Sequence, residues 1–492
     1  RSAGTAADVA RDGLENFHAA VADNAAAIFT LDLGVHNNIT LTAQHIRVDI
    51  LALQRNDLVH PHGVVEPDLL LGVQSDHMAG TVHRGKHLHQ IIDQHTGAVK
   101  ALVGGRGDKN ASRTLNRATN SVRQPGSTFK ILSTYLPALD TAGMTLATVQ
   151  DDALYYYPGT KRKVKNWYGN SYRGLTSLRE AMAQSMNVVA VKTLKDVSPK
   201  TGYDYLLNLG FTTLVDNYTS QDGKTYTDIS LPLALGGLTK GVTNLELTNG
   251  FATIANQGLY HPAFFYTKIV DHDGNVLLDN TTNTDTKQVM KESTAWLLTS
   301  AMEDVISKGT GSRLKFKKIN MPQAGKTGTS TGNRDLWFVG YTPYLTAGIW
   351  GGYDSGQKQT SLTYQKDLWR DTMEKLNQNY TKVSFKKPDS ITTAVICTKC
   401  GKLAINGICD KAVGGSCMKK EYFDKESVPK EKCDCHVRCK ICKASGHLAG
   451  DGCPSSQIYT AVYLQKNEST QTADSSLSIP RYLVGSTCKI HN

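Results

Sequence analysis

The pattern of apolar and polar positions predicts strands at both ends of a central region and helices between them. Two apolar runs within residues 90–105 flank the turn-forming His95-Thr96-Gly97, which predicts a β-hairpin. Helical spacing follows in residues 129–136 and 175–184, and runs typical of strands return in residues 335–341 and 344–353. Strands at both ends with helices between them favour an α+β fold.

Composition narrows the class of protein. The chain has 492 residues, 40% of them hydrophobic and 20% charged, so we expect two or three domains with a sizeable core. A net charge of +11 favours binding to a polyanion or to an anionic surface. There is no basic helix interleaved with aromatic residues and no zinc-finger or RNA-binding signature, so we expect no nucleic-acid partner. A membrane or cell-wall surface fits the charge better.

Two further features concern the start of the chain. No run approaches the roughly 18 to 20 apolar residues that cross a bilayer, and no signal peptide is recognisable, so any anchor or export signal is expected outside this sequence. Residues 1–88 contain eight histidines and a single lysine. These histidines show no repeated ligand spacing and no paired cysteines, so we expect no metal there. We interpret residues 1–88 as a segment of unknown character, divergent or non-native.

All ten cysteines lie after residue 395, which sets residues 395–492 apart as a Cys-rich C-terminal extension. This extension contains a short repeat. Cys397 to Cys409 aligns with Cys442 to Cys453, allowing one inserted residue. The outer cysteines occur in both copies, whereas the inner Cys400 is replaced by Ser445 in the second.

The repeat has two interpretations. A tetrahedral zinc site would need its inner ligand in both copies, which favours disulfides between the outer cysteines. Each copy also contains Asn-Gly or Asp-Gly, which turns a hairpin. We therefore expect two disulfide-closed hairpins, Cys397–Cys409 and Cys442–Cys453, each stabilising the fold by roughly 3 kcal/mol, with metal binding as the alternative. Disulfides would indicate an oxidising, extracytoplasmic location.

Candidate chemistry begins at residues 123–130, Arg-Gln-Pro-Gly-Ser-Thr-Phe-Lys. Ser127 lies at the predicted start of a helix, and Lys130 follows one turn later on the same face, where burial would let it accept the hydroxyl proton. The alternative is that Ser127 caps the helix and Lys130 is solvated. Spacing alone does not decide, because Ser-x-x-Lys also starts at Ser312, Ser355, Ser384, Ser416, Ser427 and Ser486.

Two more motifs follow downstream. Ser185-Met186-Asn187 lies between a helical stretch and an apolar run. Residues 326–329, Lys-Thr-Gly-Thr, lead into the predicted strands. Lys-Thr-Gly also occurs at residues 200–202, but a helical pattern follows that copy. Only the copy at Lys326 fits a strand.

Ser-x-x-Lys, Ser-x-Asn and Lys-Thr-Gly-Thr in this order resemble the motifs of the penicillin-interacting serine transferases. From about residue 89 onward the sequence is similar to the transpeptidase domain of class A, high-molecular-weight penicillin-binding proteins. Further similar stretches begin at Asn116, Asn166 and Asp335. The resemblance implies a β-lactamase/transpeptidase-like α+β domain over residues 89–394, with helices packed on an antiparallel sheet and a helical subdomain. A Cys-rich β-hairpin tail would follow it.

The resemblance also implies a serine D,D-transpeptidase that works through an acyl-enzyme without a cofactor. Ser127 would attack the penultimate D-alanine of a peptidoglycan stem peptide, with Lys130 as its base and Lys326 as a neighbouring cation. Ser185 would relay a proton to the leaving amine, and Asn187 would bind the catalytic lysine and the substrate amide.

The strand at 326–329 would align the substrate as an added β-strand. Thr327, Gly328 and Thr329 would contact the substrate there, with the two threonines binding its terminal carboxylate. The backbone N–H groups of Ser127 and Thr329 would form the oxyanion hole. Each residue also has a simpler reading, as a helix cap, turn residue or strand filler.

The implied partners are stem peptides ending in D-Ala-D-Ala and β-lactam antibiotics, at the outer face of a bacterial cytoplasmic membrane or in the cell wall. A longer parent would associate with the membrane and with other wall-synthesis proteins. Residues 1–88 lack the Glu-Asp-x-x-Phe-x-x-His-x-Gly signature, so we expect no glycosyltransferase activity from this chain. The alternatives are a D,D-carboxypeptidase, a β-lactamase, and a non-catalytic β-lactam sensor or wall-binding protein.

Overall fold

A computed structural model of the chain describes residues 86–105, 115–169, 171–281, 285–465, 474, 476–480 and 483–491. It also places three short strands before them: β1 (Thr30–Leu31), β2 (Leu41–Thr42) and β3 (Ile46–Ile50). The interpretation of residues 1–88 therefore falls largely outside the described residues. Within these ranges, no helix has the length and apolar character needed to span a membrane.

The chain divides into two compact units. The first consists of Arg1–Ser133 and Lys200–Lys386, and the second of Thr134–Pro199 and Lys387–Asn492. The two predicted domain boundaries, at residues 88/89 and 394/395, stay predictions.

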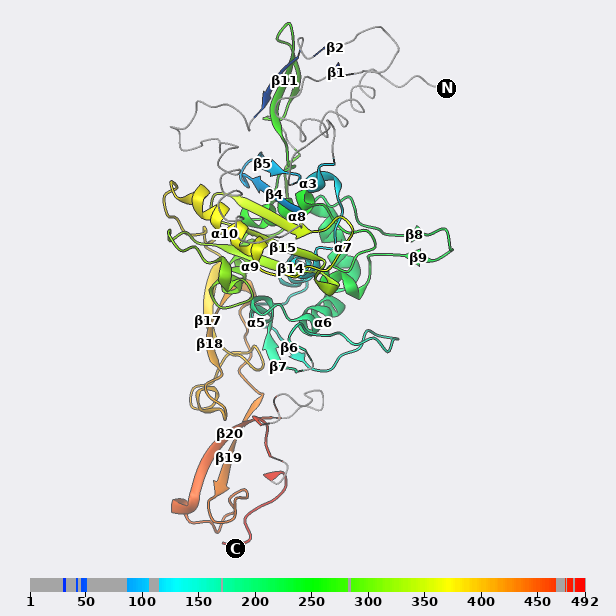
Figure 1. The fold of residues 1–492 in the computed structure, drawn as a ribbon. Helices are drawn as coiled ribbons and strands as arrows, with labels where there is room; N and C mark the ends of the chain where they lie inside the picture. The colour runs from blue at the N-terminus through cyan, green and yellow to red at the C-terminus, as the bar shows by residue number, and fades with distance from the viewer. Residues whose placement is uncertain are drawn as a thin grey trace. The chain divides into compact units, whose positions relative to one another are not determined.

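The first unit is built on a five-stranded antiparallel sheet in the order β14-β15-β16-β4-β5 (Figure 1). The hairpin predicted around residues 95–97 is confirmed, as are the two strands predicted downstream of residue 330. Among the described strands, β14 is paired on one side only, so it forms an edge of the sheet. The strands are β4 (Lys86–Ile92), β5 (Val99–Val103), β14 (Ala324–Thr329), β15 (Asp335–Tyr341) and β16 (Thr346–Gly352).

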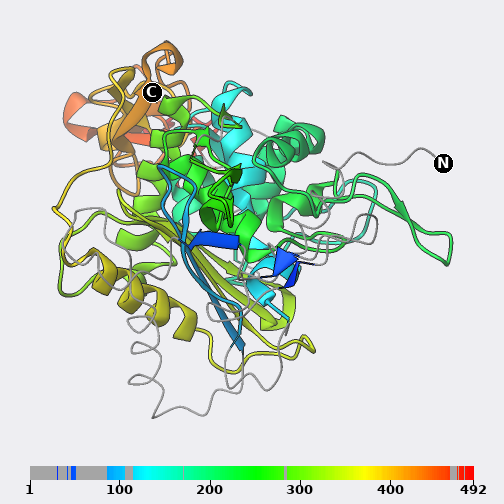
Figure 2. The ribbon, with the colours of Figure 1, turned by 90° about the horizontal axis from the view of Figure 1, so that it is seen from above.

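Helices cover both faces of this sheet. Because side chains alternate along a strand, Phe338 and its partner Ile349 lie on the face covered by α10 (Tyr364–Asn377), and Phe338 meets the ring of Trp369 edge-on at 4.7 Å. Gly348 faces the other way, where a Cβ would collide with Thr248 of α8 (Asn244–Ala255). Helix α9 (Glu292–Ser307) shares this second face through a Thr299–Tyr341 hydroxyl hydrogen bond of 2.8 Å. Figure 2 shows α10 and the green helices on opposite sides of the sheet.

Smaller elements complete this part of the chain. Strand β11 lies between β12 and β3 in a three-stranded antiparallel sheet. The elements are α3 (Arg117–Asn120), η2 (Gly126–Thr128), η3 (Ile131–Tyr135), α7 (Pro199–Asn208), β8 (Tyr218–Thr219), β9 (Thr225–Tyr226), η4 (Leu231–Leu235), β10 (Leu259–Tyr260), β11 (Tyr266–Asp271), β12 (Val276–Asp279), β13 (Lys287–Gln288), η5 (Ser312–Leu314) and η6 (Thr331–Asn333).

The second unit joins a helical segment to the C-terminal tail. The helix predicted over residues 175–184 begins only at Leu178, because β7 (Gly174–Ser177) pairs with β6 (Val149–Asp152). The tail forms two antiparallel hairpins, β17–β18 and β19–β20. The remaining elements are α4 (Leu136–Asp140), α5 (Leu178–Ala183), α6 (Asn187–Val197), β17 (Ile391–Cys397), η7 (Cys409–Lys411), β18 (Met418–Asp424), η8 (Lys425–Ser427), β19 (His436–Cys442), η9 (Ser455–Gln457) and β20 (Ile458–Leu464).

The predicted fold class is confirmed: an α+β architecture with helices on an antiparallel sheet, a helical segment and a Cys-rich hairpin tail.

Candidate active site

Ser127 lies in the first turn of a helix, as predicted. The turn is the 3-10 segment η2, and the chain stays helical through Asp140 by way of the π-helical η3. The residue that caps this turn is Pro125, which makes no side-chain capping bond. The alternative that Ser127 serves as the helix cap therefore does not describe this structure.

The start of this helix packs directly on the end of β14. A Cβ on Gly126, whose φ of +56° favours glycine, would lie 2.7 Å from the carbonyl oxygen of Thr329. A Cβ on Gly328 would lie 2.5 Å from the carbonyl oxygen of Pro125 and 2.8 Å from Cγ2 of Thr128. Glycines at these two positions allow the backbones to approach closely. Lys-Thr-Gly and Ser-x-x-Lys, about 200 residues apart in sequence, are thereby brought together.

Lys130 is fully buried, with 0% of its surface exposed, so the alternative of a solvated lysine is wrong. Its pKa is lowered well below the ordinary value, chiefly because burial penalises the charged form and further because of the positive charge of Lys326. A lysine with a depressed pKa is neutral over more of the physiological range, and a neutral amine can accept a proton.

Lys326, on β14, is also fully buried. Burial, assisted by the positive charge of Lys366, lowers its pKa to about 7. Its ammonium group donates to the carbonyl oxygen of Thr327 at 3.2 Å and lies 3.5 Å from the Thr327 hydroxyl. The lysine therefore lies beside the threonine that the motif assigns to carboxylate binding.

Two residues around Thr327 were missed by sequence reasoning. The Thr310 hydroxyl lies 2.8 Å from the Thr327 hydroxyl, and the Lys366 ammonium donates to the Thr310 carbonyl oxygen at 3.1 Å. Lys366 comes from α10 and Thr310 from the segment between α9 and η5. Neither carries a local sequence signal, because only the tertiary fold brings them to β14.

Ser185 and Asn187 lie in the second unit, at the junction of α5 and α6. Ser185 is buried and has a φ of +54°, a left-handed conformation that is costly for a residue other than glycine and is often found at functional sites. Asn187 is the first residue of α6, and its side chain donates to the Lys165 carbonyl oxygen at 2.7 Å. The Asn166 side chain accepts from the Asn187 N–H at 2.8 Å, which caps the helix.

The candidate residues are thus divided between the two units. Ser127, Lys130, Lys326, Thr327, Gly328 and Thr329 belong to the first, and Ser185 and Asn187 to the second.

The disulfides predicted in the tail are corrected by the structure. All ten cysteines, each within the described residues, are free thiols, so neither Cys397–Cys409 nor Cys442–Cys453 is bridged. The outer cysteines of each copy do come together, but a third cysteine and a histidine from a later segment join them. Because these cysteines are not bridged, they give no support for an oxidising location.

Comparison with known proteins agrees with this architecture. The model of the penicillin binding protein transpeptidase domain matches residues 89–374. The C-terminal domain of penicillin-binding protein 1A matches twice, at residues 387–438 and 437–477, which confirms an internal repeat in the tail.

Curated relatives include penicillin-binding protein 1A of Clostridium botulinum, 34% identical over 391 residues that cover 77% of this chain and 45% of the relative. Penicillin-binding protein 1F of Bacillus subtilis is 32% identical over 325 residues, or 65% of this chain and 42% of the relative. The chain therefore spans less than half the length of these relatives.

Solved structures share the fold. Penicillin-binding protein 1A from Haemophilus influenzae superimposes with a TM-score of 0.60 at 23% identity, covering 72% of this chain and 55% of that one. PonA1 from Mycobacterium tuberculosis, solved in complex with penicillin V, superimposes with a TM-score of 0.58 at 24% identity, covering 70% of this chain and 89% of that one. Since the transpeptidase model matches more than half of the 492 residues, the chain belongs to the penicillin-binding protein transpeptidase family.

Proposed function

We propose that the chain is a serine D,D-transpeptidase that cross-links peptidoglycan stem peptides and is acylated by β-lactams at Ser127. Membership of the transpeptidase family supports the reaction class. The observation that carries the choice of nucleophile is the fully buried Lys130, three residues after Ser127, with its pKa depressed beside Lys326. No other Ser-x-x-Lys lysine within the described residues is fully buried.

In the proposed first step, neutral Lys130 takes the hydroxyl proton while Ser127 Oγ bonds to the carbonyl carbon of the penultimate D-alanine. The carbonyl oxygen becomes an oxyanion that accepts from the backbone N–H groups of Ser127 and Thr329. When the peptide C–N bond breaks, the terminal D-alanine leaves with a proton on its amine. In the second step an acceptor amine attacks the ester and restores the Ser127 hydroxyl.

The position of β14 supports substrate binding by strand addition. Its second edge is open among the described strands, and an extended peptide can pair with such an edge. Lys326 and the Thr327 and Thr329 hydroxyls would bind the terminal carboxylate, and Gly328 lets the strand lie against the helix start.

Ser185 and Asn187 are proposed to complete the chemistry, Ser185 by moving a proton to the leaving amine and Asn187 by binding the substrate amide. These two roles rest on the Ser-x-Asn motif. The strained backbone of Ser185 and the Asn166 cap that fixes the start of α6 are consistent with a positioned pair.

The proposed partners are stem peptides ending in D-Ala-D-Ala and β-lactams, and the proposed location is outside the bacterial cytoplasmic membrane. Relatives named penicillin-binding protein 1A support both. Glycan polymerisation is not proposed for this chain.

The test is covalent labelling by a fluorescent penicillin, followed by peptide mapping and by release of the label over hours. Ser127→Ala should abolish labelling. Ser312→Ala is the matched control, because Ser312 begins another Ser-x-x-Lys in a 3-10 turn of the same unit, where both Ser312 and Lys315 are exposed.

A long-lived adduct on Ser127, lost only in Ser127→Ala, supports the proposal. Labelling that survives Ser127→Ala overturns it, and rapid release of the label indicates a β-lactamase instead. Incubation with a D-Ala-D-Ala pentapeptide and an amine then shows whether the acyl group is transferred to an amine or to water. Cross-linked product supports a transpeptidase, whereas release of D-alanine without cross-linking indicates a carboxypeptidase.

A further inference from the structure

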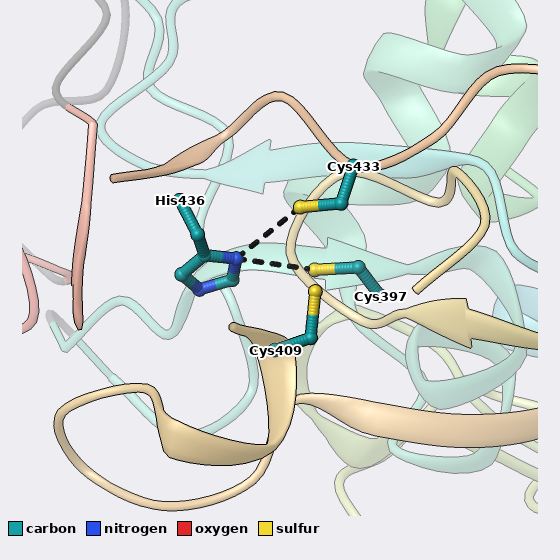
Figure 3. Close-up of side chains that lie close together, drawn as sticks. All are labelled: Cys397, Cys409, Cys433 and His436. Atoms are coloured by element: carbon teal, nitrogen blue, oxygen red, sulfur yellow. Dashed lines mark hydrogen bonds between the residues drawn. The ribbon is translucent and has the colours of Figure 1, made fainter. Parts of the chain in front are cut away.

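Three sulfur atoms, two of them from the first tail hairpin, converge on a histidine at the start of β19. Cys397 at the end of β17, Cys409 in η7, Cys433 and His436 place one ligand atom each within 4.8 Å of all the others. His436 Nδ1 lies 3.5 Å from Cys397 Sγ and 3.4 Å from Cys433 Sγ. Figure 3 shows the three sulfurs turned toward this ring nitrogen.

The second hairpin repeats the arrangement with different residues. Cys442 at the end of β19, Cys453, Cys488 and His491 again lie within 4.8 Å of one another. His491 Nδ1 is 3.4 Å from Cys442 Sγ and 3.5 Å from Cys488 Sγ. The same three-sulfur, one-nitrogen group therefore occurs twice within one compact unit.

The backbone around the two groups is also duplicated. The Cys397 N–H donates to Lys402 at 2.8 Å, and the Cys442 N–H donates to His447 at 2.9 Å. Gly401 and Gly446, four residues after those cysteines, both adopt left-handed φ angles, of +76° and +70°.

The third cysteines are held in the same way. The Cys433 N–H donates to Leu403 at 2.8 Å, and the Cys488 N–H donates to Leu448 at 2.7 Å. Each of these cysteines begins a Cys-x-x-His sequence, at 433–436 and 488–491. A chance gathering of thiols would not reproduce both the ligand types and the turn that presents them.

The spacing of the ligand atoms fits a tetrahedral metal. Zinc binds sulfur at about 2.3 Å and imidazole nitrogen at about 2.0 Å, so sulfur and nitrogen ligands in a tetrahedron lie about 3.5 Å apart. The four sulfur-to-Nδ1 distances, 3.4 to 3.5 Å, are close to that value. A disulfide would need sulfurs about 2.05 Å apart, and no cysteine here is bridged.

We infer that the tail holds two structural Zn²⁺ ions, one bound by Cys397, Cys409, Cys433 and His436 and the other by Cys442, Cys453, Cys488 and His491. This proposal replaces the disulfides expected in the tail by metal binding, the alternative interpretation of the repeat. It is independent of the proposed acyl transfer, since none of these eight residues belongs to the candidate active site.

Two of these sulfur atoms accept hydrogen bonds from backbone N–H groups, as metal-bound thiolates commonly do. The Ile405 N–H donates to Cys409 Sγ at 3.3 Å, and the Ile490 N–H donates to Cys488 Sγ at 3.4 Å. Hydrogen bonds of this kind orient metal-bound thiolates and stabilise their charge. Four full ligands per ion leave no open position, which is typical of a structural and not a catalytic zinc site.

The first copy contains two further thiols, because Cys397, Cys400, Cys433 and Cys435 form a second set of four. In the second copy the equivalent positions are Ser445 and Ile490, so only the three-cysteine, one-histidine set is common to both. That common set is the one assigned.

A structural role suits the small cores of the tail. The apolar clusters around each site consist largely of the cysteines themselves: Cys397, Cys409, Cys417 and Cys433 in one, and Cys442, Cys453 and Cys488 in the other. Modules with so little apolar surface to bury are commonly held by metals or disulfides.

The test is the metal content of the full chain, purified without chelators and measured by plasma mass spectrometry. Two zinc ions per chain are expected, with ten reactive thiols after unfolding in a chelator without reductant. Cys433→Ser and Cys488→Ser should each reduce the content to about one. Cys439→Ala is the matched control and should keep two, since this buried cysteine belongs to neither assigned set.

Several outcomes would overturn the inference: a metal-free chain that binds no added zinc, mapped disulfides between the outer cysteines, or two ions retained by both serine variants. Loss of an ion in Cys400→Ser but not in Cys409→Ser would overturn the ligand assignment of the first site. If the variants fail to fold, Co²⁺ substitution of the unaltered chain decides. Thiolate charge-transfer and tetrahedral d–d bands at two equivalents support the sites, and their absence refutes them.

Discussion

Lys130 and Lys326 are both fully buried, and the pKa of Lys130 is lowered first by that burial and further by the positive charge of Lys326. Lys366 acts on Lys326 in the same direction, so the electrostatic influence runs from α10 through β14 to the helix of Ser127. In the proposed mechanism, the sheet and its covering helix thus prepare an amine for proton transfer and also set the charge of the carboxylate-binding lysine.

The pH dependence of acylation should respond to Lys366. Lys326, with a pKa of about 7, carries its charge below that pH and loses it above, so attraction for the carboxylate of a penicillin should fall as pH rises through 7. Lys366→Met removes a charge that lowers this pKa. The pKa of Lys326 should rise, and the alkaline fall in the acylation rate should move to higher pH.

The measurement is the second-order rate constant for fluorescent penicillin from about pH 6 to about pH 9, which reports groups of the free enzyme. Lys375→Met, on the same helix, is the control and should leave the profile unchanged. An alkaline limb that stays in place in Lys366→Met would contradict the electrostatic role.

The buried charge of Lys326 should also lower the free energy of unfolding of the chain. Its pKa is about 7 in the folded chain and 10.5 in the unfolded reference, so the folded state disfavours the charged form. The penalty is complete below about pH 7, shrinks as pH rises and disappears near pH 10.5. Lys326→Met should therefore raise the free energy of unfolding by a few kcal/mol at neutral and acidic pH, and the melting temperature with it. Acylation should be lost in this variant.

Thermal unfolding followed by tryptophan fluorescence at several pH values checks this, since Trp337, Trp350 and Trp369 are buried in the same unit. The stabilisation should decrease steadily toward pH 10. A variant that is less stable than the parent at pH 6 would show that the hydrogen bonds of Lys326 to Thr327 outweigh the burial of its charge.

Sequence reasoning succeeded where a local pattern determines structure. The Lys-Thr-Gly at Lys200 was separated from that at Lys326 because a helical pattern follows the first, and Lys200 indeed lies in α7 while Lys326 lies in β14. The hairpin around Gly97 was predicted for the same reason, since turn residues flanked by apolar runs specify it locally.

It failed where partners come from distant segments. Thr310 and Lys366 reach β14 only through the tertiary fold. In the tail, ligands were sought inside each repeat, at Cys400 and its counterpart, whereas the assigned third and fourth ligands come from later segments. The recurrence of Cys-x-x-His at Cys433 and Cys488 was the sequence signal for them.

Gly328 should be intolerant of a side chain. Alanine there would place a Cβ 2.5 Å from the carbonyl oxygen of Pro125, so β14 would have to move away from the helix start that carries Ser127. Displacements of about 1 Å in a catalytic site can reduce rates by about a hundredfold. We expect Gly328→Ala to slow penicillin acylation at least tenfold, with near-normal circular dichroism.

Gly450→Ala is the control, because the atom nearest to its Cβ position, the Cys488 carbonyl oxygen, is 3.9 Å away. An unchanged acylation rate in Gly328→Ala would mean that the contact with Pro125 does not position the strand.

The C-terminal tail should stabilise the helix that precedes Ser185. Arg179 of α5 and Glu421 of β18 form a buried ion pair, 5% and 2% exposed, with the Arg179 Nε and a terminal guanidinium nitrogen each 2.8 Å from Glu421 Oε1. Removing one partner of such a pair leaves an uncompensated buried charge and costs about 3 to 5 kcal/mol. Glu421→Leu should therefore destabilise the second unit by that amount in urea unfolding.

The double variant Arg179→Met with Glu421→Leu should recover most of this loss, because replacing both charges by apolar groups removes the unpaired charge. Asp204→Asn, which breaks the exposed Lys200–Asp204 pair, is the matched control and should cost less than about 1 kcal/mol. If Glu421→Leu behaves like that surface variant, the tail does not hold α5 through this pair. If it behaves as expected, acylation should weaken along with stability, because α5 leads directly into the strained turn at Ser185.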